Sequence, residues 1–253
     1  MSLVAIHILT VPVAGDSAAY GCQDKIDQAR SAYYNLRNHG FNGFTATIEP
    51  NWRVTLGPTA TKENLKIFRA LRFSMVVDAN GTVSVSHEVI SLDKARVEPY
   101  AAQIQENVLR LVAGSFGTWA RFVIASPFPE NETPVKIENS GEECRVFYAV
   151  ESANIALAMT NDLITEWKLT APNARRTINP SFRKTSGGLL LNSYKSVFEP
   201  AGVGVKTTSD VTIEYQDVEG MKLPHKIAIR GLYGSEPFAA ELTFKQYVLN
   251  PRT

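Results

Sequence analysis

Residues 145–171 read RVFYAVESANIALAMTNDLITEWKLTA, and this stretch decides the class of fold. Three runs rich in aliphatic and aromatic residues, 145–151, 155–160 and 164–171, follow one another with short polar breaks between them. Such runs, bounded by turn residues, are typical of β-strands. The breaks are too short to hold a crossover helix, so we expect neighbouring strands to run antiparallel.

The same pattern continues on both sides of this stretch and fills the chain after Pro134. Short connections without helices predict an antiparallel meander that curls, rather than a parallel sheet. The nine candidate strands are Val135–Asn139, Arg145–Glu151, Ile155–Thr160, Ile164–Ala171, Ser181–Thr185, Leu189–Phe198, Asp210–Gln216, His225–Gly231 and Ala239–Val248.

Helices are predicted only before Pro134. The spacing of apolar residues favours an amphipathic helix over 23–39 that stops at Gly40. A second helix of about three turns is expected after an N-cap at Thr61. A third opens at Glu98-Pro99, carries Ile104 and Val108 on its apolar face, and is expected to be interrupted at Gly114 and Gly117.

Strands are also expected in the first half. Residues 43–48 alternate apolar residues with threonines, and Trp52, Val54 and Leu56 repeat that period of two. Residues 73–87 carry Asn80-Gly81 between two strand-like runs, which is a strong β-hairpin signal. Together these patterns predict an α+β fold: a curved antiparallel sheet, or open half-barrel, with amphipathic helices packed on its concave face.

The chain reads as a single domain, because no linker rich in proline or serine divides its 253 residues. Residues 1–22 form an extended arm or a residual export segment, and 23–253 form the helix-plus-sheet body. The apolar run Leu3–Ala14 is too short to cross a bilayer, which takes about 20 residues. No transmembrane segment is expected.

Composition excludes several classes of function. A formal charge of +1 disfavours a nucleic-acid partner. The phosphate-binding glycine motifs are absent, and the four histidines lack metal-ligand spacing, so we expect neither cofactor nor metal. Cys22 could be lipidated, buried, or joined to Cys144 by a disulfide. The densest basic cluster, Arg175-Arg176 with Arg183-Lys184, could meet an acidic head group, although a charged turn between edge strands is the preferred interpretation.

One segment, residues 211–227, carries a resemblance to a known family. Its pattern Tyr215-x4-Gly220-x2-Leu223-Pro224-x2-Ile227 resembles the late strands of the LolA/LolB-like lipoprotein-carrier superfamily. That resemblance implies an incompletely closed antiparallel barrel with helices against its concave face. It further implies a periplasmic or cell-envelope location and a lipoprotein or envelope protein as partner. The arginine motifs of classical carriers are missing, so no family residue is carried over.

A half-barrel with helices in its mouth can enclose an apolar cavity. We therefore expect a non-catalytic binding protein, a monomer, that holds a lipid or the acyl chains of a lipoprotein. Large apolar residues that face the inside of a small barrel also pack together as ordinary core, so the hypothesis concerns the cavity as a whole and not each lining residue. The candidate lining residues are Phe44, Ile48, Trp52, Val54, Leu65, Phe68, Ile104 and Val108.

Two other classes of function stay open. The first is an interaction or sensor module that uses a sheet edge or the concave face. The second is a hydrolase or isomerase whose acid–base residues, from Asp210, Glu214 and His225, converge only in the folded chain. A dry cavity of several hundred Å³ would favour the binding protein. A filled core with an unpaired sheet edge would favour the interaction module. A polar pocket that contains carboxylates with shifted pKa values would favour the enzyme.

Overall fold

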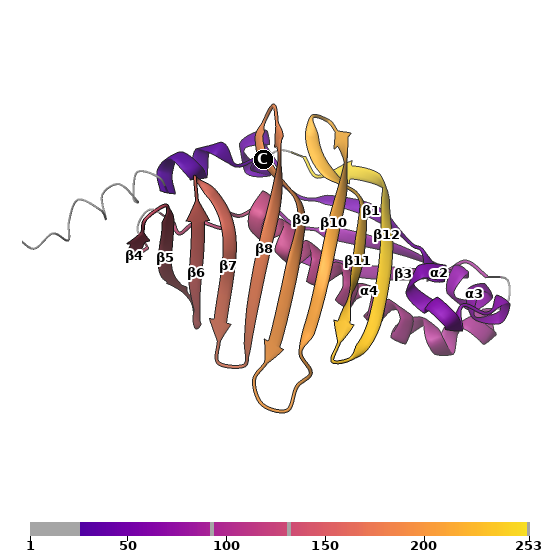
Figure 1. Ribbon diagram of the computed structural model, residues 1–253. Coiled ribbons are helices and arrows are strands. Elements are labelled where there is room, and N and C mark those ends of the chain that lie inside the picture. Colours follow the sequence, from indigo (N-terminus) through magenta and orange to yellow (C-terminus); the bar gives the residue numbers. More distant parts are fainter. Residues whose placement is uncertain (1–25, 92–93, 131–132, 252–253) are drawn as a thin grey trace, which may run out of the picture.

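The computed structural model describes residues 26–91, 94–130 and 133–251 of the chain. Its main element is one 12-stranded antiparallel sheet in the order β3-β2-β1-β12-β11-β10-β9-β8-β7-β6-β5-β4 (Figure 1). The last strand, β12, pairs with the first, β1, so strands from both ends of the chain share one sheet. Strands β3 and β4 are its edges, and the sheet is not closed.

The nine strands after Pro134 confirm the predicted meander. Strand β8 is much longer than the predicted 181–185, because Arg175 and Arg176 already pair with Glu199 and Phe198 of β9. The observed strands are β4 (Lys136–Ser140), β5 (Glu143–Val150), β6 (Ala153–Thr160), β7 (Leu163–Ala171), β8 (Ala174–Thr185), β9 (Gly188–Pro200), β10 (Thr207–Val218), β11 (Met221–Tyr233) and β12 (Glu236–Leu249).

The segment that carries the family resemblance forms the β10–β11 hairpin. Its turn needs positive φ at two successive residues, and these are Glu219 at 49° and Gly220 at 83°. A β-bulge lies next to Pro224: Tyr215 pairs with Pro224 and Glu214 with Lys226, so His225 is the extra residue. Proline lacks the N–H that a regular ladder needs, and a bulge is one of the few places where a sheet accepts it.

The predicted β1 and the β2–β3 hairpin are confirmed. The three strands are β1 (Phe44–Pro50), β2 (Leu71–Val77) and β3 (Val83–Val89). In the hairpin turn the Asp78 carboxylate accepts the backbone N–H groups of Asn80 and Thr82, both at 2.8 Å. Gly81 then takes a φ of 84°, which a residue with a side chain rarely adopts.

The period of two at Trp52, Val54 and Leu56 misled the prediction of a strand there. Residues Trp52–Leu56 form the short helix α2, followed by the 3-10 turn η2 (Gly57–Thr59). The carbonyl of Asn51 accepts the N–H groups of Val54 and Thr55, both at 3.0 Å. Trp52 is buried while Val54 is exposed. Five residues are too few to distinguish the period of two of a strand from the period of 3.6 of a helix.

The predicted helix over 23–39 is wrong in its middle. Residues 26–32 are helical and a 3-10 turn, η1 (Leu36–His39), precedes Gly40, but the intervening residues are extended. Tyr33 bridges to Leu189, and the Tyr34 N–H donates to the Leu189 carbonyl at 3.0 Å. Pairing with Leu189, at the start of β9, therefore takes the place of one helical turn.

Helix α3 (Lys62–Arg69) begins as predicted, with the Thr61 hydroxyl accepting the Asn64 N–H at 3.1 Å. Its eight residues make about two turns, fewer than expected, because Leu71 already belongs to β2.

Helix α4 (Lys94–Val123) is longer than predicted and runs through both Gly114 and Gly117. Glycine within a helix costs about 1 kcal/mol. Phe116 and Trp119, which lie on the same stretch, are fully buried, and each large apolar side chain gains about 1.5–3 kcal/mol by burial. Packing therefore outweighs the interruption expected from the sequence.

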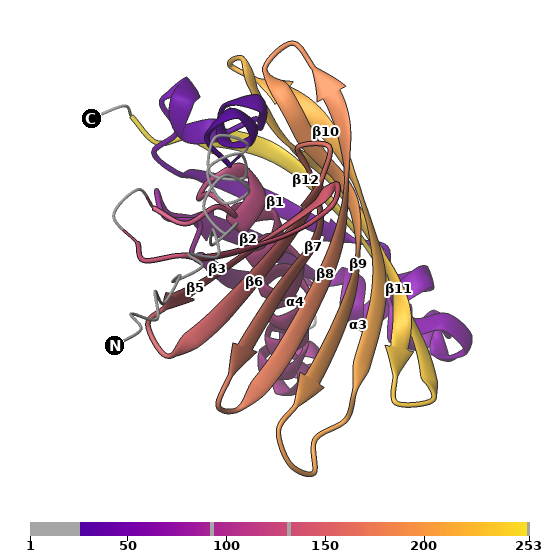
Figure 2. The same cartoon turned by 60° about the vertical axis from the view of Figure 1, so that its left-hand side comes forward.

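Helix α4 lies against one face of the sheet (Figures 1 and 2). Its Gln105 side chain donates to the Val85 carbonyl of β3 at 2.9 Å, and Arg176 of β8 donates to its Gly114 carbonyl at 3.1 Å. In this way α4 connects edge strand β3 with the opposite half of the sheet. No helix among the described residues is long and apolar enough to cross a membrane.

The predicted arm or export segment, residues 1–22, lies outside the described residues, as does Cys22. Cys144 on β5 is buried and disulfide-bonded.

Candidate functional site

A cavity of about 630 Å³ lies between α4 and strands β8 to β11. Most of its lining surface is apolar, and polar groups come from serine, threonine and arginine side chains. The lining residues are Arg110, Leu111, Gly114 and Ser115 of α4, Arg176 of β8, Tyr194, Ser196 and Phe198 of β9, Thr207, Ser209 and Val211 of β10, and Ile229 of β11.

The floor of the cavity is built from three cross-strand rows. Every second residue of a strand faces the same side of a sheet, and the register aligns these residues between neighbours. We call them the inner row, the middle row and the outer row. They consist of Tyr194, Val211 and Ile229; of Ser196, Ser209 and Gly231; and of Phe198, Thr207 and Tyr233.

Small side chains in the middle row explain why the floor is hollow. Ser196 lies opposite Ser209, and Ser209 lies opposite Gly231. Above them α4 presents Gly114 and Ser115. Protein interiors normally fill such space with close-packed side chains. Here the side chains of the middle row and of the facing turn of α4 are too small to fill it.

The inner end of the cavity is closed by buried groups. The Tyr194 hydroxyl donates to the Ser115 carbonyl at 3.4 Å, and the Ser115 hydroxyl donates to the Leu111 carbonyl at 2.9 Å. Burial raises the pKa of Tyr194, with the Arg176 charge opposing that rise. The phenol is therefore neutral at physiological pH and acts as a hydrogen-bond group.

Arg176 is the chemically distinctive residue of the cavity wall. Its guanidinium donates to the Thr118 hydroxyl at 2.7 Å and to the Gly114 carbonyl at 3.1 Å, both neutral acceptors. No carboxylate of the described residues lies within ion-pair distance of it. Burial lowers the pKa of Arg176, but arginine starts so far above neutrality that it stays charged.

This arrangement leaves a positive charge without a counter-ion in an apolar wall. A buried charge is unfavourable unless a charge of opposite sign pairs with it. A carboxylate or phosphate in the cavity would complete the site, because a guanidinium binds either group through parallel hydrogen bonds. Arg110 differs, since its exposed side chain is already paired with Glu106 at 3.1 Å.

The structure places the eight residues predicted from the sequence elsewhere. None of them lines this cavity. Phe44, Ile48, Trp52, Leu65, Ile104 and Val108 are buried, Phe68 is half-buried and Val54 is exposed. Phe44 packs against Phe116, and Trp52 stacks near Phe68 with ring centroids 4.7 Å apart. Ligand contact by these residues stays a prediction.

Of the candidate functional residues noted in the sequence, only the basic cluster includes one that lines the cavity, which is Arg176. Neighbouring strand residues point to opposite faces, so Arg176 faces the cavity while Arg175 is exposed on the other side. Arg183 lies over the Tyr215 ring at 5.1 Å and does not join them. Ser196 of β9 and Thr207 and Ser209 of β10 also line the cavity, but only the strand register shows that Ser196 lies opposite Ser209.

The three candidate acid–base residues do not form a cluster. Asp210 and Glu214 are exposed on β10, where Asp210 lies 3.8 Å from Lys195. His225 is half-buried on β11, and its Nδ1 atom is buried without a hydrogen-bond partner. No hydrogen bond or ion pair joins any two of these three described residues.

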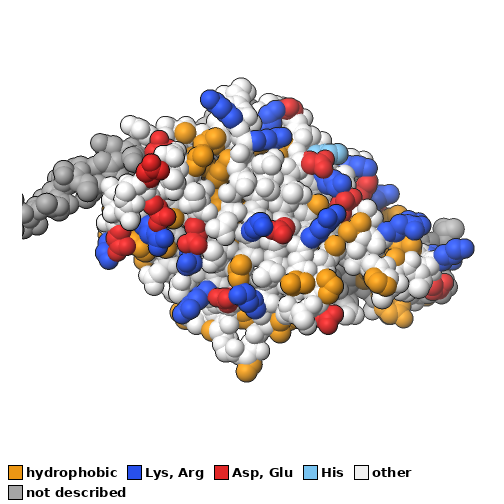
Figure 3. Space-filling model, viewed as in Figure 1, with side chains coloured by type: hydrophobic (Ala, Val, Ile, Leu, Met, Phe, Trp, Pro, Cys, Tyr) orange, Lys and Arg blue, Asp and Glu red, His pale blue; other side chains and the backbone are white. Residues whose placement is uncertain are grey.

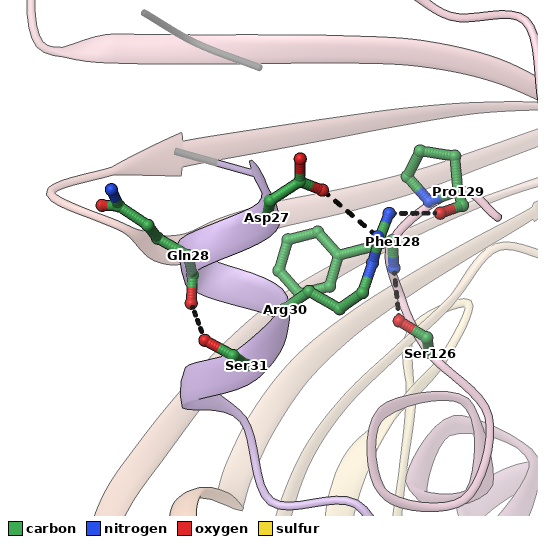
Figure 4. A network of polar contacts seen from close by, with 7 residues as sticks. All are labelled: Asp27, Gln28, Arg30, Ser31, Ser126, Phe128 and Pro129. Carbon is green, nitrogen blue, oxygen red and sulfur yellow. Dashed lines mark hydrogen bonds and ion pairs between the residues drawn. The ribbon is translucent and has the colours of Figure 1, made fainter. Parts of the chain in front are cut away.

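A second hollow, of about 710 Å³, lies beside the N-terminal helical segment and is lined in part by Arg30, Arg37 and Arg121. Arg30 donates to Asp27 at 3.2 Å and to the Pro129 carbonyl at 2.8 Å, with Phe128 beside it (Figure 4). These contacts tie the helical segment to the loop after α4, which is a structural role.

Within the described ranges, no group of three or more histidine, cysteine, aspartate and glutamate residues could hold a metal ion. No protein-family model, curated protein or solved structure matches this chain.

Proposed function

We propose that the protein binds an amphiphile with a long apolar chain and an anionic head group, and that it does so without catalysis. The observation that carries this proposal is Arg176, a charged group without a carboxylate partner in the wall of a mostly apolar cavity. A purely apolar ligand would not use that charge, and a small anion would not use the apolar surface.

The size of the cavity suits such a ligand. Its volume of about 630 Å³ falls within the ~300–1,000 Å³ typical of small-molecule sites. Each buried methylene contributes about 0.8 kcal/mol. Ten methylenes would therefore supply about 8 kcal/mol, which corresponds to micromolar binding before any contribution from the head group.

The polar groups of the cavity wall define where the head group lies. Arg176 belongs to the outer part of the floor, because it pairs with Phe198 of the outer row. The chain of the ligand would then extend past the middle row toward Val211 and Ile229 of the inner row. Ser196 and Ser209 would flank it with short side chains that leave room.

The setting we propose agrees with the resemblance in the β10–β11 segment. We infer that the sheet curves around α4, so that the cavity lies on its concave face. A monomeric carrier or sensor in the periplasm or cell envelope, with a lipid or the acyl chains of a lipoprotein as ligand, fits this arrangement.

Displacement of a fluorescent long-chain fatty acid tests the proposal. We expect a saturable signal that a fatty acid displaces better than the fatty alcohol of equal length. Arg176→Met keeps most of the aliphatic stem and removes the charge, and we expect it to weaken fatty-acid binding by about tenfold or more. Alcohol binding should stay within about threefold, because it does not use the charge.

Arg175→Met is the matched control, since it removes the neighbouring charge from the opposite face. It should leave both affinities unchanged. Native mass spectrometry of protein purified from cells, followed by organic extraction, then identifies the natural ligand. A protein that carries nothing and gives no probe signal would refute the proposal.

A further inference from the structure

Exposed apolar side chains gather at one end of strands β9 to β12. Twelve large hydrophobic residues are exposed in the described part of the chain, and five of them lie in this small region. We call these five the apolar rim: Phe198, Val203, Val205, Leu232 and Tyr233. Val203 is fully exposed at the tip of the β9–β10 loop, and Tyr233 is 57% exposed at the β11–β12 turn.

The two connections that carry the apolar rim lie side by side. Phe198 and Tyr233 face the cavity side of the sheet, and Leu232, next to Tyr233 on β11, faces the other side. Thr207 pairs with Phe198 on one side and with Tyr233 on the other. The Gly234 N–H donates to the Lys206 carbonyl at 2.8 Å, which ties the turn to the loop. Both connections project from the same end of the sheet (Figure 1).

The apolar rim is continuous with the mouth of the cavity. Phe198 belongs to both. Along β9 the exposed fraction rises from 3% at Tyr194 and 6% at Ser196 to 40% at Phe198. The cavity is therefore closed at its inner row and open at its outer row, next to the rim.

Two charge pairs lie near the apolar rim, while Arg176 lies opposite Phe198 and Glu236 lies opposite Tyr233 in the sheet. Lys206 lies 2.9 Å from Glu199, and Arg110 lies 3.1 Å from Glu106. The lower tip of the molecule carries an orange side chain among white atoms, and lysine, arginine and acidic side chains lie above it (Figure 3). Apolar tips with charges set behind them suit the interface of a lipid bilayer, where apolar groups enter the acyl boundary and polar groups stay in water.

We propose that the apolar rim docks on the surface of a lipid bilayer, so that an amphiphile passes between bilayer and cavity without crossing bulk water. This inference rests on the proposed function, because the open end of the cavity points to a lipid surface as the occupant. Since the exposed side chains of the rim are apolar, insertion of these side chains drives docking and salt has little effect on it.

Sedimentation of the full chain with phosphatidylcholine vesicles, with and without added phosphatidylglycerol, tests this proposal. We expect the protein to sediment with both, and added salt to reduce binding by less than about threefold. Val203→Asp and Tyr233→Asp should each lower vesicle partitioning by about tenfold or more. Val248→Asp is the matched control, because Val248 is 63% exposed near the other end of β12; it should bind like wild type.

Two measurements separate docking from ligand binding. Val203→Asp should still bind the fluorescent fatty acid in solution, since Val203 does not line the cavity. Ser209→Leu, which fills the cavity, should lose the probe and keep its vesicle binding.

Docking is refuted if wild type stays with neither vesicle, or if Val248→Asp loses as much binding as Val203→Asp. A dimer that Val203→Asp abolishes, in a protein that ignores vesicles, would assign the rim to a second copy of the chain instead.

Discussion

One helix, α4, covers two parts of the same sheet that differ in how completely they are filled. Its Phe116 and Phe122 contact rings from the sheet: the Phe116 and Phe244 centroids lie 5.1 Å apart, and the Phe122 and Phe182 centroids 5.9 Å apart. Trp119 packs beside Phe116 on the same helix. Leu111, Gly114 and Ser115, which directly precede Phe116 along the helix, cover the cavity instead. We call these parts the packed region and the hollow region.

The two regions differ in side-chain volume. Antiparallel pairing continues through both regions, with β-bulges beside Phe44, Phe182 and Tyr215. In the packed region aromatic residues face one another, whereas in the hollow region Ser196 faces Ser209 and Gly231. The backbone therefore sets the distance between helix and sheet, and the residue type decides whether a cavity remains.

Truncation of one ring in each region should show the largest contrast. Phe116→Ala is expected to lower the free energy of unfolding by about 3–5 kcal/mol, because a fully buried ring leaves a cavity. Phe198→Ala, at a residue that is 40% exposed, should cost less than about 1 kcal/mol. Urea unfolding followed by circular dichroism measures both. Equal losses would remove the distinction between the regions.

Alkaline pH should weaken the packed region through Tyr33, whose ring contacts Phe182 with centroids 4.8 Å apart. Burial raises the pKa of Tyr33 from its ordinary value near 10 to about 12. Above pH 10 the unfolded chain loses this proton first, so the stabilisation is complete below pH 10 and falls as pH rises toward 12.

We expect Tyr33 to account for about 2 kcal/mol of this loss. Tyr33→Phe should be less stable than wild type near pH 8, because the Ile164 N–H loses its acceptor at 2.7 Å. That deficit should narrow toward pH 12. Unfolding curves of both proteins across this range measure it, and a constant deficit would contradict the burial of the phenol.

Filling the hollow region should remove binding without unfolding the protein. Ser209→Leu places an aliphatic side chain into the cavity, and we expect at least a tenfold loss of fatty-acid affinity, or about 1.4 kcal/mol. Its stability should change by less than about 1 kcal/mol. Thr212→Leu on the exposed face of β10 is the control. Unchanged affinity in Ser209→Leu would mean that the ligand lies elsewhere.

The smallest expected effect concerns the helix above the cavity. Nothing lies within 4 Å of a β-carbon built on Gly114, so Gly114→Ala meets no clash. We expect a gain of about 0.5–1 kcal/mol in the free energy of unfolding, because alanine favours the helical state. Thermal and urea unfolding measure it. A loss of stability would show that the space around Gly114 is too small for a methyl group.

The strands were predictable because their pattern is local. Runs such as 155–160 and 164–171 carry enough residues to show their period and their turns, and all nine strands after Pro134 are found. The errors fall where few residues carry the pattern, as at Trp52–Leu56, or where a distant strand competes, as Leu189 does for Tyr33.

The predicted site failed to coincide with the cavity for a related reason. The residues chosen were large and apolar, as in Phe44 and Val108, and such residues fill space in a core. The cavity is instead bounded by small residues, Ser196, Ser209 and Gly114, whose significance depends on what lies opposite them.

The sequence alone predicted an α+β fold, a long antiparallel meander and a hairpin over 73–87, because alternation and turn chemistry act between near neighbours. The tertiary structure alone decided that β12 joins β1, that α4 spans the sheet, and that Arg176 faces a cavity with no counter-ion among the described residues. Register and packing bring together residues far apart in the chain, so the volume and charge at their meeting point are properties of the fold.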